Sequence, residues 1–158
     1  MTSEAANALL FFTAAQHPFL ASILNRIVPA GGNFPAAGDL GVVAYLDTVV
    51  GQAADLKRLF AQGLAQITIA SQAQYGQEFV GASDDQKDAV LRQVEAANPT
   101  FFEALVQHTY SGYYSHPTVI RLLGIEVWPP QPRGHHLEPF DLGLLENIKQ
   151  RGPLYRQA

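Results

Sequence analysis

The chain has 158 residues, of which 47% are hydrophobic and 15% are charged, and its formal net charge is −4. This length fits one domain with a substantial core, and the low share of charged residues indicates that another molecule covers part of the surface. The acidic balance argues against a nucleic-acid partner, because phosphate binding needs a basic face. The absence of cysteine excludes disulfides, thiolate-held clusters and cysteine nucleophiles in this chain.

The sequence pattern of the N-terminal part predicts a short helix, followed by a longer one with a clear helical period. Residues 3–12 are expected to form a short leading helix or to fray, and they end in the apolar run Leu-Leu-Phe-Phe. Apolar residues then repeat with a helical period over residues 19–28. Thr13 with Gln16 resembles a capping box for this helix, or Pro18 sets a slightly later start.

A loop over residues 29–39, with three glycines and two prolines, separates this helix from the next. Asp39 is expected to cap a helix whose apolar positions lie between Val42 and Val50. Their spacing fits a helix better than a strand, although the β-branched residues leave a strand as the alternative. A long helix over residues 53–75 follows, with Gly76 as its stop signal.

The helices of the second half begin at recognisable caps. Ser83 and Gln86 form a capping box for one helix. Asn98, followed by proline, starts the next helix, which has the densest aromatic content in the chain. The sequence Ser-His-Pro at residues 115–117 predicts an extended turn, and a short helix is expected over residues 118–123.

The aromatic helix carries two parallel rows of side chains at a spacing of four residues. One row is Phe101, Leu105, Thr109 and Tyr113, and beside it lie Phe102, Val106 and Tyr110. Three aromatic residues are expected in the core, namely Phe101, Phe102 and Tyr110. Three others are expected either in the core or at an interface, namely Tyr113, Tyr114 and Trp128.

The C-terminal region has a different composition. Residues 126–139 contain four prolines and the only tryptophan, so they are expected to run extended. A last helix is predicted over residues 142–150. The fold class is therefore all-α, a single-domain bundle of about six or seven helices over residues 1–125. Residues 126–158 form a proline-rich arm with a terminal helix, packed on the core or on a partner.

No pattern in the chain predicts catalysis, cofactor binding or metal binding. His108 and His116 lie on either side of the predicted turn, and His135 is adjacent to His136, without an HExxH pattern or carboxylates at ligand spacing. These histidines are interpreted as structural or surface residues. A metal-dependent enzyme that uses the four of them is an alternative. The serines lack the surroundings of a nucleophile elbow.

Four stretches, in order, resemble the gluconate 2-dehydrogenase subunit 3 family. They are ILNRIVPAGG (23–32), GVVAYLDTVV (41–50), QAQYGQEFVGASDDQKDAVL (72–91) and FFEALVQHTYSGYYSHP (101–117). The resemblance covers roughly residues 13–125. Its most specific part is the pattern T-x-x-G-x-Y-S-x-P at residues 109–117, called the signature below.

The resemblance implies a small helical accessory subunit. Members of the family accompany a large FAD-binding enzyme of the glucose-methanol-choline type, which oxidises sugars or sugar acids, and a cytochrome often completes the complex. The small subunit is thought to act in a chaperone-like way on the large one. A non-catalytic chain without a cofactor of its own is therefore expected, with FAD in the partner subunit and a cytochrome or other electron acceptor in the complex.

This chain departs from the family pattern at both ends. Many members carry a twin-arginine export signal, whereas this N-terminus has neither a basic region nor a twin-arginine pair. A cytoplasmic location is expected, or a periplasmic one if a signal was removed or is carried by the partner. No apolar run reaches the roughly 20 residues that a membrane span needs. After Pro117 the family commonly has Gly-Gly-Asn, but this chain reads TVIRLLG. A glycoside, in place of gluconate, is therefore an alternative substrate for the partner enzyme.

The predicted interface combines the turn after the aromatic helix with the C-terminal arm. Its residues are Tyr113, Tyr114, His116, Pro117, Trp128, Pro129, Pro130 and Tyr155. The alternative function is that of a stand-alone helical protein that binds a small molecule at the turn formed by Tyr113, Tyr114 and His116.

Overall fold

The computed structural model of the chain describes residues 11–125 and residue 143. The chain divides into two units, Met1–Glu126 and Val127–Ala158, and the elements below all belong to the first. The predicted arm over residues 126–139 lies outside the described residues, and so does the predicted helix over residues 142–150 apart from Gly143. The division of the chain at residue 125 therefore stays a prediction.

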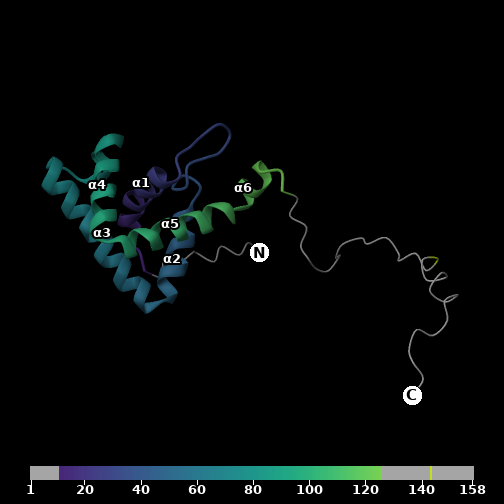
Figure 1. Ribbon diagram of the computed structural model, residues 1–158, viewed down its shortest axis with the longest axis horizontal. Coiled ribbons are helices and arrows are strands. Elements are labelled where there is room, and N and C mark those ends of the chain that lie inside the picture. Colours follow the sequence, from purple (N-terminus) through teal and green to yellow (C-terminus); the bar gives the residue numbers. More distant parts are fainter. Residues whose placement is uncertain (1–10, 126–142, 144–158) are drawn as a thin grey trace, which may run out of the picture. The chain divides into compact units, whose positions relative to one another are not determined.

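The described part is all-α, which confirms the predicted fold class. It contains α-helices, two short 3-10 helices (η) and no strand. In chain order the elements are η1 (Ala14–Gln16), α1 (His17–Ile27), α2 (Val42–Gln52), α3 (Ala54–Tyr75), η2 (Phe79–Gly81), α4 (Asp84–Ala97), α5 (Pro99–Tyr114) and α6 (Pro117–Leu122). Helix α5 contacts each of α1 to α4, and α6 continues beyond its C-terminal end (Figure 1).

Two of the predicted helix starts are confirmed by their cap geometry. At α4, the Gln86 amide donates to Ser83 Oγ, and the Ser83 amide donates to Gln86 Oε1 at 3.0 Å. At α5, the Phe101 amide donates to Asn98 Oδ1 at 3.2 Å. These side chains satisfy amides that have no partner inside their own helix, which explains why the sequence signals are reliable there.

The predicted cap of α2 is wrong. The residue before this helix is Gly41, with φ of 84°, a left-handed conformation that glycine adopts without strain. Asp39 instead accepts a hydrogen bond from Asn25 Nδ2 at 3.0 Å, so its side chain is held by α1.

The predicted capping box at Thr13 and Gln16 lies one element earlier than expected. Gln16 Oε1 accepts from the Thr13 amide at 2.9 Å, and this cap precedes η1. Helix α1 then begins at His17.

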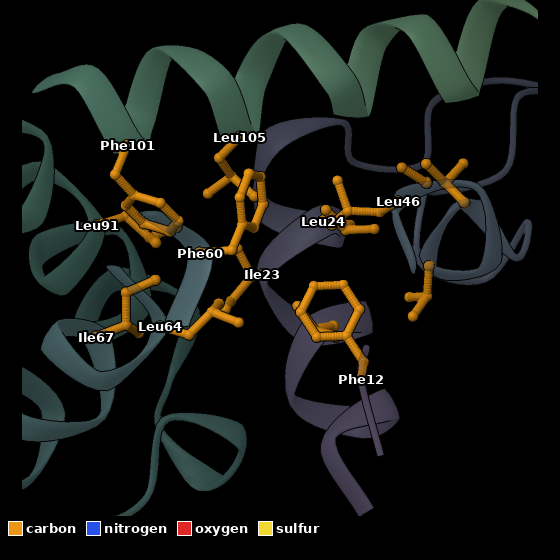
Figure 2. Close-up of a cluster of buried hydrophobic side chains, with 14 of the residues drawn as sticks. Phe12, Ile23, Leu24, Leu46, Phe60, Leu64, Ile67, Leu91, Phe101 and Leu105 are labelled. Atoms are coloured by element: carbon orange, nitrogen blue, oxygen red, sulfur yellow. The ribbon is translucent and has the colours of Figure 1, made fainter. Parts of the chain in front are cut away.

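The core lies where α5 crosses the other helices. Figure 2 shows Phe101 and Leu105 pointing from α5 toward the interior, where Phe60 and Ile23 are labelled among the side chains that they face. The rings of Phe60 and Phe101 meet edge to face, with centroids 5.4 Å apart. These side chains are fully buried, and each contributes roughly 1.5–3 kcal/mol by leaving water.

The N-terminal segment is tied to α2 by a buried carboxylate. Asp47 Oδ1 accepts hydrogen bonds from the amides of Phe11 at 2.9 Å and Phe12 at 2.7 Å. The Phe12 ring is buried near Phe60, with ring centroids 6.4 Å apart. Phe11 and Phe12 form a bend rather than the end of the predicted leading helix, and residues 3–10 lie outside the described residues.

Candidate functional site: the C-terminal half of α5

The two aromatic rows of α5 have different environments. The row from Phe101 to Tyr113 is buried along its whole length, at the residues Phe101, Leu105, Thr109 and Tyr113. In the second row Phe102 and Val106 are half-buried, and Tyr110 is 43% exposed. Both rows have the same spacing, but α2 and the loop over residues 29–39 cover the end of the first row at Gly112 and Tyr113. The prediction that Tyr110 belongs to the core is therefore wrong.

The signature residues attach α5 to α2 and to the loop over residues 29–39. A Cβ atom at Gly112 would lie 2.6 Å from Tyr45 Cδ1 and 2.8 Å from Val42 Cγ1, so any larger residue would force these side chains of α2 to shift. One residue later, the Tyr113 hydroxyl donates to the carbonyl oxygen of Pro35 at 2.8 Å. Burial raises the pKa of Tyr113, and the neighbouring Tyr114 raises it further.

The end of the signature forms the turn into α6. The Ser115 hydroxyl donates to the carbonyl oxygen of Gly112 at 3.3 Å. His116 has an extended backbone, with φ of −71° and ψ of 130°, and its Nδ1 accepts from the Thr118 amide at 3.2 Å. Pro117 is the first residue of α6. The signature thus fixes the C-terminal end of α5, because Tyr113, Ser115 and His116 all form hydrogen bonds within this chain.

Two tyrosines on the outer side of this end of α5 face solvent. The rings of Tyr110 and Tyr114 are stacked, with centroids 6.0 Å apart and planes 25° from parallel. Tyr114 is 52% exposed, and its ring meets the buried ring of Tyr113 edge to face at 5.3 Å. We call Tyr110 and Tyr114 the tyrosine pair. Its position is fixed from beneath, while its outer faces are free to contact another molecule.

A groove of about 280 Å³ lies between α1, α4 and α5. It adjoins the tyrosine pair, because Tyr110 is a member of the pair and also lines the groove. Its apolar lining comes from Ile27, Leu91, Phe102, Val106 and the Tyr110 ring, and its charged lining comes from Arg26, Asp88, Arg92 and Glu95. The groove therefore combines an apolar surface with charges of both signs, a composition typical of protein interfaces.

One wall of the groove is fixed by an ion pair between α1 and α4. Arg26 Nε and Nη2 donate to the two carboxylate oxygens of Asp88 at 2.7 and 2.8 Å, and Arg26 Nη1 lies 2.7 Å from Asp84 Oδ2. The hydrogen bonds from Arg26 hold the pKa of Asp88 below its ordinary value, and the charges of Arg26 and Arg92 lower it further. The same hydrogen bonds raise the pKa of Arg26. Sequence reasoning missed this pair, since its members are 62 residues apart.

A second pocket, of about 430 Å³, lies on another side of the domain. It is lined by residues of the N-terminal segment, η1, α1 and α3, namely Phe11, Phe12, Gln16, Phe19, Ala61, Leu64, Ala65 and Thr68. Its lining is apolar apart from Gln16 and Thr68, and it contains no ionisable side chain. Neither pocket includes Tyr113, Tyr114 or His116 in its lining.

The sequence profile of the gluconate 2-dehydrogenase subunit 3 family matches residues 14–129. The chain belongs to this family. The match begins at the first residue of η1 and extends past α6, so it includes every helix of the described part and the whole signature. Comparison with curated proteins gives no match, and comparison with solved structures gives none either.

The predicted interface residues of this family member fall into two groups. Tyr113 is buried, His116 is half-buried, and Tyr114 and Pro117 are exposed, all at the end of α5. The others lie outside the described residues, namely Trp128, Pro129, Pro130 and Tyr155. The structure therefore brings the first group together at one end of the helix, and the role of both groups stays a prediction. Tyr110 lies beside Tyr114 on the exposed side of α5. The spacing of four residues between them could have indicated this from the sequence.

The histidines proposed for a metal site do not gather with other ligands in the described part. There, no three side chains of His, Asp or Glu come together as a metal site would require. His108 lies on α5 and His116 caps α6, while His135 and His136 lie outside the described residues. None of the described helices is both long enough and apolar enough to cross a bilayer.

Proposed function

We propose that this chain is the non-catalytic small subunit of a flavin-dependent sugar, glycoside or sugar-acid dehydrogenase, and that it supports folding, stability or assembly of the large FAD-binding subunit. The observation that carries the proposal is the family match over residues 14–129, since the family is named for subunit 3 of a gluconate dehydrogenase. In this proposal FAD belongs to the partner, and electrons leave through a cytochrome or another acceptor in the complex.

The surface at the C-terminal half of α5 supports this proposal. Tyrosine is enriched among the residues that dominate binding energy, because its ring buries a large area at a small cost in side-chain entropy. The tyrosine pair is held from beneath by Tyr113, and the groove extends the same surface toward α4. We assign this surface, together with exposed Pro117, to contact with the large subunit.

The tyrosine pair and the groove form only part of the expected interface. Obligate subunit interfaces bury about 2,000 Å² or more in total, which is more than two tyrosines and one groove provide. Further contacts must come from other parts of the chain. The C-terminal residues Trp128, Pro129, Pro130 and Tyr155 remain the predicted source of these contacts.

Co-expression with a candidate flavoprotein tests the function. With an affinity tag on this chain, we expect the large subunit to co-purify and the complex to show flavin absorption in the visible spectrum. Expressed alone, the large subunit should be insoluble or free of flavin. Independent purification of both chains, with the flavoprotein fully active by itself, would contradict the proposal.

Substitution of the tyrosine pair tests the surface separately. The double variant Tyr110→Ala/Tyr114→Ala should weaken binding of the large subunit at least about tenfold, because interface anchors typically contribute more than about 1 kcal/mol each. Ile69→Ala is the matched control, since Ile69 is 67% exposed on α3, away from the signature. Equal binding by the double variant and the control would remove this surface from the interface without disproving the subunit role.

A further inference from the structure

The outer face of α3 carries no charged side chain over most of its length. From Leu59 to Gln77 the chain contains no Asp, Glu, Lys, Arg or His, although 15% of all its residues are charged. The exposed positions of α3 within this stretch hold only alanine, glutamine, threonine and isoleucine. The core of a protein interface is depleted of charged residues in the same way, so this face has the composition of a covered surface.

A projecting apolar side chain and an apolar hollow lie next to each other on this face. Ile69 is 67% exposed, which is the largest value among the exposed large hydrophobic side chains of the described part. The second pocket, of about 430 Å³, is lined on the α3 side by residues between Ala61 and Thr68, and Phe11 and Phe19 form part of its remaining wall. The projection and the hollow therefore occur within about two turns of one helix.

These two features complement each other when the chain meets a second copy of itself. The α3 lining of the pocket is centred roughly 7 Å along the helix from Ile69 and about a quarter turn around it. Two features of one surface are exchanged by the two-fold axis that lies in the contact plane and bisects the line between them. In such a contact Ile69 of each copy enters the pocket of the other. Because the line between the features runs obliquely to the helix, the two α3 helices cross.

The chemistry of the face favours a second copy over a charged partner. A contact about a two-fold axis brings a surface against itself, so a charged face repels its own copy. The chain has a formal net charge of −4, and this face avoids the repulsion because it carries no charge. Its glutamine amides both donate and accept hydrogen bonds, so they can pair with the glutamines of another copy. We propose that two copies of this chain associate through the outer faces of α3, with Ile69 of each copy in the second pocket of the other.

This contact is separate from the surface assigned to the large subunit. Ile69 and the second pocket share no residue with the tyrosine pair or with the groove. The inference therefore does not depend on the proposed function. Crossed helices meet over a small area, so the association should be weak, with a dissociation constant of roughly 10–500 µM.

Sedimentation equilibrium of the purified full chain tests the inference. Between about 5 µM and about 1 mM the wild-type chain should pass from monomer to dimer. Ile69→Glu places a charge at the contact and should weaken the dimer at least about tenfold, and it should unfold at the wild-type temperature because Ile69 is exposed. Leu122→Glu is the matched control, since Leu122 is another exposed apolar side chain but lies on α6, and its dimer should be as strong as that of the wild type.

Cross-linking locates the contact independently. The chain has no cysteine, so a single introduced thiol can form a disulfide only with a second copy. Ala65 lines the pocket one turn before Ile69 and lies close to the proposed axis, whereas Ala73 is exposed one turn beyond Ile69 and lies away from it. Disulfide formation needs Cα atoms within about 7 Å, so Ala65→Cys should give a covalent dimer on mild oxidation and Ala73→Cys should give little.

The inference is overturned if the wild-type chain stays monomeric at about 1 mM, or if Ile69→Glu dimerises as strongly as the wild type. It is also overturned if Leu122→Glu loses the dimer to the same extent, or if Ala73→Cys cross-links as readily as Ala65→Cys. If the free chain is monomeric and Ile69→Glu instead abolishes co-purification of the large subunit, this face belongs to that subunit and not to a second copy.

Discussion

Substitution of Gly63 by alanine tests the packing of α5 on α3. An added Cβ atom would lie 2.2 Å from Cγ of Phe101 and 2.3 and 2.4 Å from its two Cδ atoms. Carbon atoms in contact normally stay about 3.5–4.0 Å apart, so the ring would have to move by more than about 1 Å. Phe101 is fully buried and its ring lies edge to face against Phe60, which leaves little space for that movement.

Two opposing effects determine the size of the change. Alanine is favoured over glycine inside a helix by about 1 kcal/mol. Overpacking of a closely packed core typically costs about 1–3 kcal/mol, and the overlap at Gly63 involves three atoms of one ring. Because three ring atoms overlap, the cost should lie at the upper end of this range, at about 2–3 kcal/mol. After the gain from helix propensity, we expect Gly63→Ala to lower the free energy of unfolding by about 1–2 kcal/mol.

Urea unfolding followed by circular dichroism measures this effect, and a double-mutant cycle identifies its cause. Phe101→Ala alone should cost about 3–5 kcal/mol through the cavity that it leaves. In that background Gly63→Ala should be neutral or stabilising, because the ring that it would strike is gone. Gly81→Ala is the control, since no atom lies within 4 Å of its Cβ position.

The reasoning fails under either of two results. If Gly63→Ala is as stable as the wild-type chain, α5 can move away from α3 and the close approach is not required. If Gly63→Ala costs the same with and without the Phe101 ring, the loss has another cause. In both cases the control should stay within about 0.5 kcal/mol of the wild type.

Three further predictions concern polar groups. Asp47→Ala removes the acceptor of two amides in the N-terminal segment and should cost about 1–3 kcal/mol in urea unfolding, with faster hydrogen exchange at those amides. The pKa of Asp88 is lowered in the fold, so its pairing with Arg26 stabilises the fold fully above the unfolded pKa of about 3.9. This stabilisation is lost as the pH falls through the folded pKa. The free energies of unfolding of the wild type and Asp88→Asn should therefore converge in acid. Tyr113→Phe should cost about 1 kcal/mol, and an ultraviolet titration should lose a tyrosine that ionises above the ordinary pH, because the pKa of Tyr113 is raised by burial.

Contradictory results for these three predictions are equally specific. Unchanged stability of Asp47→Ala would show that the N-terminal segment is not held by this carboxylate. A constant stability difference between wild type and Asp88→Asn throughout the acid range would show that the ion pair does not lower the pKa of Asp88. If the tyrosine that is lost from the ultraviolet titration of Tyr113→Phe ionises at the ordinary pH, burial does not raise the pKa of Tyr113.

The sequence determined the parts of the structure that rest on local interactions. The caps at Ser83 and Asn98, the stop at Gly76 and the helical periods each depend on residues a few positions apart, so the pattern predicts them directly. The all-α class follows from these elements. The family resemblance, carried mainly by the signature, was confirmed by the match over residues 14–129.

The sequence alone did not decide which face of each helix meets a neighbour. Tyr110 and Tyr113 are both aromatic members of one apolar face, yet the first is exposed and the second is buried. Their periodicity is the same, and only the positions of α2 and the loop over residues 29–39 separate them. Asp39 was likewise assigned to the wrong partner, because Asn25 of α1 competes for its carboxylate.

Tertiary structure decided the contacts between distant residues, for a simple physical reason. The bonds from Tyr113 to Pro35, from Phe12 to Asp47 and from Arg26 to Asp88 join residues that are 78, 35 and 62 positions apart. A hydrogen bond or ion pair of this kind depends on how whole helices cross, and no local pattern records that. The sequence determined that the chain is a helical member of its family, and the packing of α5 decided which of its tyrosines are exposed.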